Sequence, residues 1–149
     1  MKIGFFGTKE WEKKYIEARK DKMPGADSWF TEEIVSDDHL PKETDFEAIS
    51  VFVDSAVTAK VLEKFSCLKF IATRSTGYDH IDMKAVKARA ITVSSVTSYG
   101  ENTVAEMAFG LLLTLSRKIY EAYDRIREAG NWSVEGLQGF DLRGKTIGV

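Results

Sequence analysis

The sequence predicts a doubly wound α/β fold built on a parallel sheet of five strands. Short apolar runs alternate with helical patterns through the first hundred residues, and the connections between them are short. The apolar run from Leu68 to Ala72 is bounded by polar residues, which is typical of a parallel strand covered on both faces. This alternation favours a sheet with helices on both sides.

The five expected strands lie at residues 2–6, 30–35, 48–53, 68–72 and 90–93. The first is an apolar run closed by Gly7-Thr8, and the third is strongly apolar, whereas the second alternates only weakly. Between the second and third strands, residues 37–45 are polar and contain Pro41. We expect a loop there, with at most one helical turn.

Three helices are expected between these strands, at residues 11–22, 58–65 and 83–88. In the first, apolar residues recur at helical spacing among charges until Pro24-Gly25 ends the helix. In the second, Val61, Leu62 and Phe65 are expected to face inward.

A longer helix is expected from Asn102 to Ala129, with Asn102 as its N-cap and Gly130-Asn131 as its stop. At 1.5 Å per residue it would be about 40 Å long. Its first half is apolar nearly all round, so one face needs a second domain or a second chain to cover it. We therefore expect a homodimer through residues 102–129. After it, Lys145 to Val149 is expected to open a new parallel strand with no successor, as if the sequence were cut.

Residues 70–82 are expected to form a strand, a bend and a helix start. After the strand, Arg74 brings a positive charge, Ser75 and Thr76 bring hydroxyls, and Gly77 permits a turn that exposes backbone N–H groups. Asp79 or Asp82 is expected to cap the following helix. This combination predicts a binding site for a small anion, most simply a carboxylate. The alternative is an ordinary β-to-α turn with a solvated Arg.

Composition indicates a soluble globular protein, since 44% of the residues are apolar and 30% are charged. The net charge of −2 provides no field for nucleic acid or an anionic membrane, and no segment is apolar enough to span a bilayer. Cys67, the lone cysteine, is expected to be a small buried apolar residue, which fits a reducing cytoplasm. No metal site is expected.

Several motifs together resemble the NAD-dependent D-isomer-specific 2-hydroxyacid dehydrogenases, a family that includes D-lactate and D-3-phosphoglycerate dehydrogenases. The similar stretches occur in the family's order and extend along the whole chain: Arg74 to Asp82, Tyr99, Asn102 to Glu106, Trp132, and Leu142 to Val149. Any one of these motifs alone would be a weak signal, whereas the set is specific.

The resemblance implies a longer, two-domain enzyme. Residues 1–101 would form a flavodoxin-like substrate-binding domain, and residues 102–149 the interdomain and dimerisation helix and the start of a truncated Rossmann domain that binds NAD. In the family, the strand corresponding to Lys145–Val149 runs into the fingerprint G-x-G-x-x-G. The family's catalytic Arg, Glu and His would also lie beyond Val149, so His39 and His80 are not expected to replace them. We expect His80 to be structural.

By resemblance, backbone amides around Thr76 and Gly77 would hold the substrate carboxylate, and Thr76 would also touch the nicotinamide side of the cofactor. Tyr99 matches a tyrosine that D-lactate-type members point at the substrate; its alternative is an aromatic residue that fills a gap beside the long helix. Arg74 would either neutralise the cleft as a substrate-binding residue or pair with an acid such as Glu106, and we favour the pairing.

The expected function is the interconversion of a small 2-oxo acid and a D-2-hydroxy acid with NAD(H), with the D-lactate type favoured. The chain alone is expected to have no dehydrogenase activity and little affinity for NAD. One departure from the D-lactate type is Asp54-Ser55, where such members often carry an aromatic residue. The alternative function is a stand-alone flavodoxin-like module that binds a small anion or a protein; Gly7-Thr8-Lys9 fits neither a phospho-acceptor receiver nor an FMN-binding flavodoxin.

Overall fold

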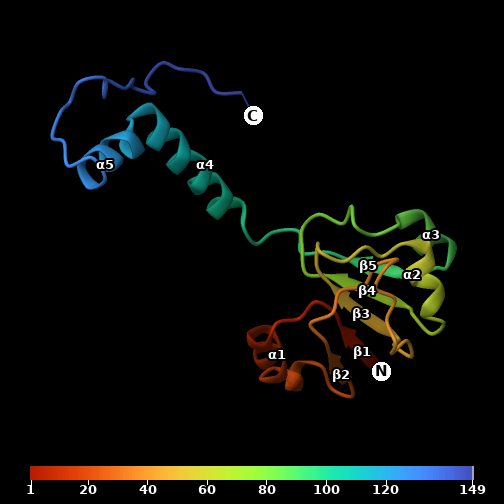
Figure 1. Ribbon diagram of the computed structural model, residues 1–149. Coiled ribbons are helices and arrows are strands. Elements are labelled where there is room, and N and C mark those ends of the chain that lie inside the picture. Colours follow the sequence, from red (N-terminus) through yellow and green to blue (C-terminus); the bar gives the residue numbers. More distant parts are fainter. Residues whose placement is uncertain (149) are drawn as a thin grey trace. The chain divides into compact units, whose positions relative to one another are not determined.

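The computed structural model describes residues 1–148, which fall into two compact units, the first from Met1 to Ser98 and the second beginning at Tyr99 (Figure 1). The first unit holds the sheet and three α-helices, and the second holds two helices and the segment after them. The expected assignment of residues 1–101 to a substrate domain and 102–149 to a second part concerns the longer protein and stays a prediction. Within residues 1–148, no helix combines the length and the apolar character that a membrane crossing requires.

The first unit contains the predicted five-stranded parallel sheet. Its strands are β1 (Lys2–Phe5), β2 (Asp27–Phe30), β3 (Ala48–Val51), β4 (Phe70–Thr73) and β5 (Thr92–Ser94). They are all parallel and are arranged in the order β2-β1-β3-β4-β5. This is the strand order of flavodoxin-like folds, in which the direction of winding reverses between β1 and β3. The predicted fold class of this unit is confirmed.

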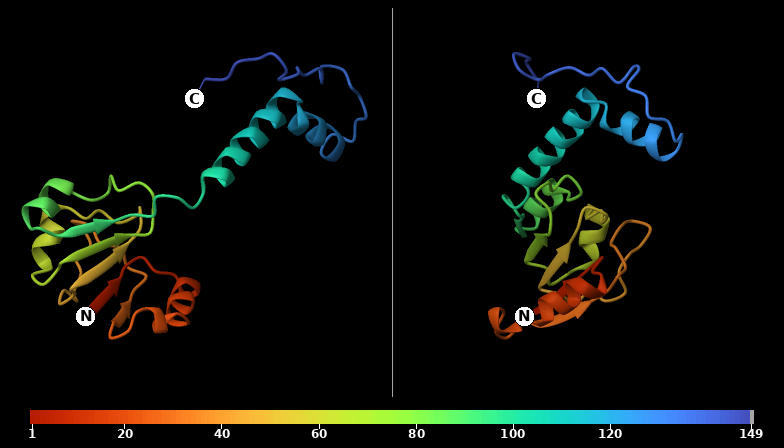
Figure 2. Two further views of the ribbon diagram at one scale, coloured as in Figure 1. Left: turned by 180° about the vertical axis from the view of Figure 1, so that it is seen from behind. Right: turned by 90° about the vertical axis from the view of Figure 1, so that its left-hand side faces the viewer.

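Helices lie on both faces of this sheet, as in a doubly wound fold, although Phe70 of β4 and Thr92 of β5 are exposed on the α1 side. The helices are α1 (Glu10–Glu17), the short 3₁₀ helix η1 (Lys20–Lys22), α2 (Ala59–Lys64) and α3 (Met83–Ala88). Helices α2 and α3 contact each other on one side, and α1 lies on the other (Figures 1 and 2). The side chain of Asp82 accepts a hydrogen bond from the Ala85 N–H at 2.9 Å, so Asp82 is the predicted N-cap of α3.

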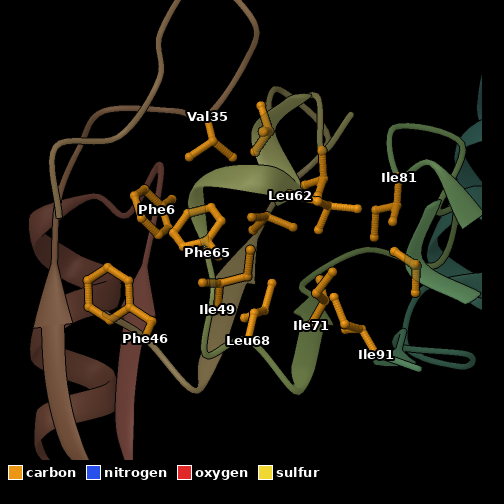
Figure 3. Close-up of a cluster of buried hydrophobic side chains, with 14 residues drawn as sticks. Phe6, Val35, Phe46, Ile49, Leu62, Phe65, Leu68, Ile71, Ile81 and Ile91 are labelled. Atoms are coloured by element: carbon orange, nitrogen blue, oxygen red, sulfur yellow. The ribbon is translucent and has the colours of Figure 1, made fainter. Parts of the chain in front are cut away.

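The larger hydrophobic core lies under α2 and α3 (Figure 3). Phe6 makes edge contacts with Phe46 and Phe65, with ring centroids 5.8 and 6.0 Å apart. As predicted for α2, its Val61 and Leu62 are buried, as is Phe65 directly after it. The opposite face has a smaller cluster of Ile3, Phe5 and Ala48, against which Ile16 of α1 packs.

Two predictions about the first unit are wrong. Strand β2 lies at Asp27–Phe30 instead of residues 30–35, because it is an edge strand that pairs only with β1 and needs less apolar sequence than a central strand. Phe30 is the last residue of β2, and its ring stacks on Phe5 at 4.8 Å. Cys67 is exposed instead of buried, because it precedes the start of β4.

The single helix predicted from Asn102 to Ala129 is also wrong. The chain forms α4 (Glu101–Ser116) and α5 (Ile119–Arg127), and Lys118 between them adopts a left-handed φ of 53° that interrupts the helical ladder (Figure 1). Helix α4 begins one residue before the predicted N-cap, after Gly100. The predicted end of the helix at Gly130-Asn131 agrees with the structure. Gly130 has a φ of 57°, and the Asn131 N–H donates to the Arg125 carbonyl at 3.0 Å, as at a helix C-terminus.

The segment after α5 folds back onto the break between the two helices. The Phe140 N–H donates to the Ser116 carbonyl at 2.9 Å, and Arg117 forms an ion pair with Asp141 at 3.0 Å. A Cβ at Gly139 would overlap the Ser116 carbonyl oxygen, so only glycine allows this close approach. Backbone packing against this segment therefore holds the break in place.

The strand predicted at Lys145–Val149 does not form within the described residues. Gly144 has a φ of 74°, the Lys145 N–H closes a turn on the Leu142 carbonyl at 3.0 Å, and residues 145–148 are irregular. Val149 lies outside the described residues. A single parallel strand has no neighbour here with which to exchange backbone hydrogen bonds, which explains the irregular conformation.

Candidate functional site

The candidate site lies where the chain leaves β4, at the carboxyl edge of the parallel sheet. Ligands of open α/β sheets bind at this edge. Ile71, Thr73 and Ser75 are all buried, so the alternation of the strand continues for two residues past its end. Thr76, Gly77 and Tyr78 then turn outward and are exposed. We refer to residues Ser75 to His80 as the β4 bend.

The β4 bend carries a run of backbone N–H groups without protein acceptors. Within residues 1–148, none of the six N–H groups from Ser75 to His80 donates a hydrogen bond to a protein atom. Several carbonyls of the bend, in contrast, are used: those of Ser75, Tyr78 and His80 accept from Val96, Ile81 and Val57. Backbone donors that lack a protein partner and face solvent are suited to bind an anion.

Gly77 has an unexpected role in this bend. Its φ lies outside the left-handed region, so the backbone does not require glycine there as we had expected. A Cβ at this position would meet only the Asp79 carboxylate oxygen, at 3.7 Å. Glycine at position 77 therefore leaves open space beside the unpaired backbone N–H groups, and it is not needed to relieve backbone strain.

Three side chains tie the two ends of the bend together. Thr73 Oγ1 lies 2.6 Å from Ser75 Oγ and 3.1 Å from His80 Nε2, and Ser75 Oγ donates to the Gly77 carbonyl at 2.7 Å. Partial burial lowers the pKa of the His80 imidazole, and the neighbouring Asp79 carboxylate opposes this effect. This set of contacts was not predicted, although the inward period-two positions 71, 73 and 75 were a usable signal.

Arg74 is held by the protein. Its guanidinium donates to the carbonyls of Phe6 and Gly7 at 3.0 Å each and to Ser50 Oγ at 3.1 Å. Its Nε lies 3.4 Å from the Glu12 carboxylate, as an ion pair without hydrogen-bond alignment. Burial lowers the pKa of Arg74, and the Glu12 charge opposes this effect.

These contacts test the prediction for Arg74. The favoured pairing with an acid is confirmed, and the acid is Glu12 of α1 instead of the suggested Glu106. Arg74 thus joins the ends of β1 and β3 to α1. Its contact with a substrate stays a prediction.

The remaining candidate residues are placed as follows. Tyr99 belongs to the second unit and is 73% exposed, so its contact with a substrate stays a prediction. Asp54 is exposed after β3. His39 contacts Ser36 in an exposed loop, with Nδ1 3.3 Å from the hydroxyl. No cluster of three or more potential metal-binding side chains occurs in the described part of the chain.

Residues 6–138 match the family described as D-isomer specific 2-hydroxyacid dehydrogenase, catalytic domain. The chain belongs to this family. A 2-hydroxyacid dehydrogenase homolog of Haemophilus influenzae is 38% identical over the whole chain, and the D-lactate dehydrogenase of Escherichia coli K12 is 35% identical. The chain spans 45% of the length of each.

Solved structures of this family share the fold. The apo-structure of Escherichia coli D-lactate dehydrogenase superimposes with a TM-score of 0.70 at 34% identity over 94% of this chain and 44% of that chain. The D-lactate dehydrogenase of Aquifex aeolicus, complexed with NAD and lactic acid, gives a TM-score of 0.77 at 26% identity over 94% of this chain and 41% of that chain. The resemblance seen in the sequence is thereby confirmed.

Proposed function

We propose that this chain is the substrate-binding part of an NAD-dependent D-2-hydroxyacid dehydrogenase of the D-lactate type. Its β4 bend would hold the carboxylate of a small 2-oxo or D-2-hydroxy acid through the backbone N–H groups of Thr76, Gly77 and Tyr78. The observation that carries this proposal is the run of consecutive N–H groups that have no acceptor within residues 1–148. The stand-alone binding module is not favoured, because the relatives are dehydrogenases that are longer than this chain.

The chemistry of the bend suits a carboxylate. Two carboxylate oxygens accept several hydrogen bonds, and hydrogen bonds to an ionised acceptor are stronger than neutral ones. Holding the carboxylate fixes the position of the neighbouring keto carbon, which is the atom to be reduced. We further propose that Thr76 touches the nicotinamide side of the cofactor and that Tyr99 contacts the substrate.

NAD would supply the hydride, but the residues of this chain do not form a complete site for it. No two of the eleven glycines are separated by one residue, so the chain lacks the G-x-G pair that admits a pyrophosphate. The family resemblance puts the catalytic Arg, Glu and His beyond Val149. We therefore expect no NADH-dependent turnover of pyruvate by the purified 149-residue chain, and measurable turnover would contradict this assignment.

A titration with pyruvate tests the carboxylate site directly. In the ¹⁵N-labelled chain, pyruvate should shift the backbone amide signals of residues 75–80 more than any others. Acetone is the matched control because it keeps the keto group and lacks the carboxylate, and it should leave these signals in place. Equal shifts with acetone, or shifts confined to other amides, would contradict the proposal.

We also propose a homodimer through α4. Its apolar side chains are exposed on several sides, with Val104 at 70%, Met107 at 63% and Leu115 at 73%. An apolar surface of this kind is usually covered by a partner. Sedimentation of the chain should show a dimer that Leu115→Glu converts to a monomer, and a monodisperse wild-type monomer would contradict the proposal. A cytoplasmic location is proposed as well, because the exposed thiol of Cys67 fits a reducing compartment.

A further inference from the structure

We propose that His80 is a positioning residue for carboxylate binding: through the hydroxyls of Thr73 and Ser75, it fixes the peptide unit between Gly77 and Tyr78 so that the Tyr78 N–H faces the ligand. This inference rests on the proposed function and adds a residue that does not itself touch the substrate. It follows from the direction of the hydrogen bonds behind the bend.

The direction of these hydrogen bonds is determined from one end. The Gly77 carbonyl only accepts, so the Ser75 hydroxyl donates its proton to it at 2.7 Å. Ser75 Oγ must then accept from the Thr73 hydroxyl at 2.6 Å, because its own proton is already used. Thr73 Oγ1 must in turn accept from His80 Nε2 at 3.1 Å. His80 therefore carries a proton on Nε2.

The hydrogen bond to the Gly77 carbonyl sets the orientation of the Tyr78 N–H, which is the donor that would face the ligand. In a trans peptide unit, the carbonyl oxygen and the following N–H point in opposite directions, and no peptide bond in the described chain is cis. Ser75 is 5% exposed, so the Gly77 carbonyl is turned toward the interior. The Tyr78 N–H is consequently turned away from it, toward the exposed side of the bend.

His80 closes the chain of hydrogen bonds at the far side of the bend. Thr73 stands before the bend and is 2% exposed, whereas His80 ends the bend and is anchored by its carbonyl, which accepts from the Val57 N–H at 2.8 Å. The imidazole thus joins the two ends of the β4 bend, whose backbone N–H groups donate no hydrogen bond to the protein. Without it, Thr73 Oγ1 would lack a donor in a buried position, and the bend would be free to sample other conformations.

The first test is the tautomer of His80 in the complete 149-residue chain. Long-range ¹H–¹⁵N spectra of the imidazole should show the neutral form with its proton on Nε2. A proton on Nδ1 in the neutral form would overturn the inference, since Thr73 would then have no donor. This measurement needs no substitution and so does not depend on a variant that folds.

The second test compares substitutions at His80 by their effect on pyruvate binding. His80→Leu removes the donor, whereas His80→Gln retains an N–H near the position of Nε2. We expect His80→Leu to weaken binding several-fold and to shift the carbonyl ¹³C signal of Gly77, and His80→Gln to stay within about twofold of wild type. Ser75→Ala should have the largest effect, about tenfold. Equal loss in the Leu and Gln variants, or none in His80→Leu, would overturn the inference.

Failure of this inference is distinguishable from failure of the proposed function. If pyruvate does not perturb the amides of the bend in the unmodified chain, the carboxylate site itself is contradicted, and the positioning role falls with it. If pyruvate binds at the bend and His80 carries its neutral-form proton on Nδ1, the carboxylate site stands and only the role of His80 is overturned.

Discussion

The two units of this chain differ in how completely they bury their own apolar surface. In Met1–Ser98, helices lie on both faces of the sheet, and Phe6, Phe46 and Phe65 are almost fully buried. In the second unit, the most apolar helix, α4, has only Ser116 buried. The first unit has the features of an independently stable domain. The exposed apolar residues of α4, in contrast, are suited to contact a partner surface.

The largest effect is expected in the core of the first unit. Phe65→Ala should lower the free energy of unfolding by about 3–5 kcal/mol, because a fully buried aromatic ring leaves a cavity. The matched control is Ile147→Ala in the second unit, outside α4, where the side chain is 61% exposed and the change should stay within about 0.5 kcal/mol. Urea unfolding measures both values. Similar losses at the two positions would remove the contrast between the units.

The next effect concerns the break between α4 and α5. Gly139→Ala should detach the following segment from Ser116, at a cost of about 1–3 kcal/mol, because the added methyl group would overlap a backbone carbonyl. Faster hydrogen exchange of the Phe140 amide would report this loss. Gly110→Ala is the control, since it has open space and should stabilise α4 by about 0.5–1 kcal/mol. Unchanged exchange at Phe140 in Gly139→Ala would show that the segment does not hold the break.

A smaller effect on stability and a larger one on binding are expected at the bend. Gly77→Ala should leave the unfolding free energy within about 0.5 kcal/mol of wild type, because the backbone is not strained and the space is open. The methyl group would occupy the space beside the free amides, so the affinity for pyruvate should fall about tenfold. Gly100→Ala, which also has open space, is the control. Full retention of binding by Gly77→Ala would place the ligand elsewhere.

The smallest effect is the pH dependence contributed by His80. Because burial lowers the pKa of His80 in the folded state below the ordinary 6.5, folding favours the neutral ring. Its contribution to stability is complete above pH 6.5 and decreases as the pH falls through the folded pKa. The unfolding free energy of wild type should therefore drop slightly more than that of His80→Gln between pH 7.5 and 5.5. An opposite sign would mean that the folded protein favours the protonated ring.

The sequence predicted the first unit well because its elements have local signals. The strong apolar run of β3 and the aspartate that caps α3 are visible in a few consecutive residues. The break at Lys118 had no such signal, since neither proline nor glycine occurs there, and it depends on Gly139, more than twenty residues later. Sequence reasoning therefore extended the helical pattern straight through it.

The candidate site shows the same limit. Thr76 and Gly77 were identified from their position after a strand, and the lack of protein acceptors for their backbone N–H groups is compatible with that prediction. The partner of Arg74 was missed, because Glu12 lies more than sixty residues earlier and only the sheet brings it close. The contact between His80 and Thr73 depends on how the bend closes, which the order of residues does not specify.

A crystal structure of this chain with bound pyruvate tests the central claim most directly. The account predicts carboxylate oxygens about 2.7–3.2 Å from the backbone nitrogens of Thr76, Gly77 and Tyr78. Arg74 should keep its contacts with Glu12 and with the carbonyls of Phe6 and Gly7. A carboxylate bound to the Arg74 guanidinium, or seated away from the β4 bend, would contradict the account.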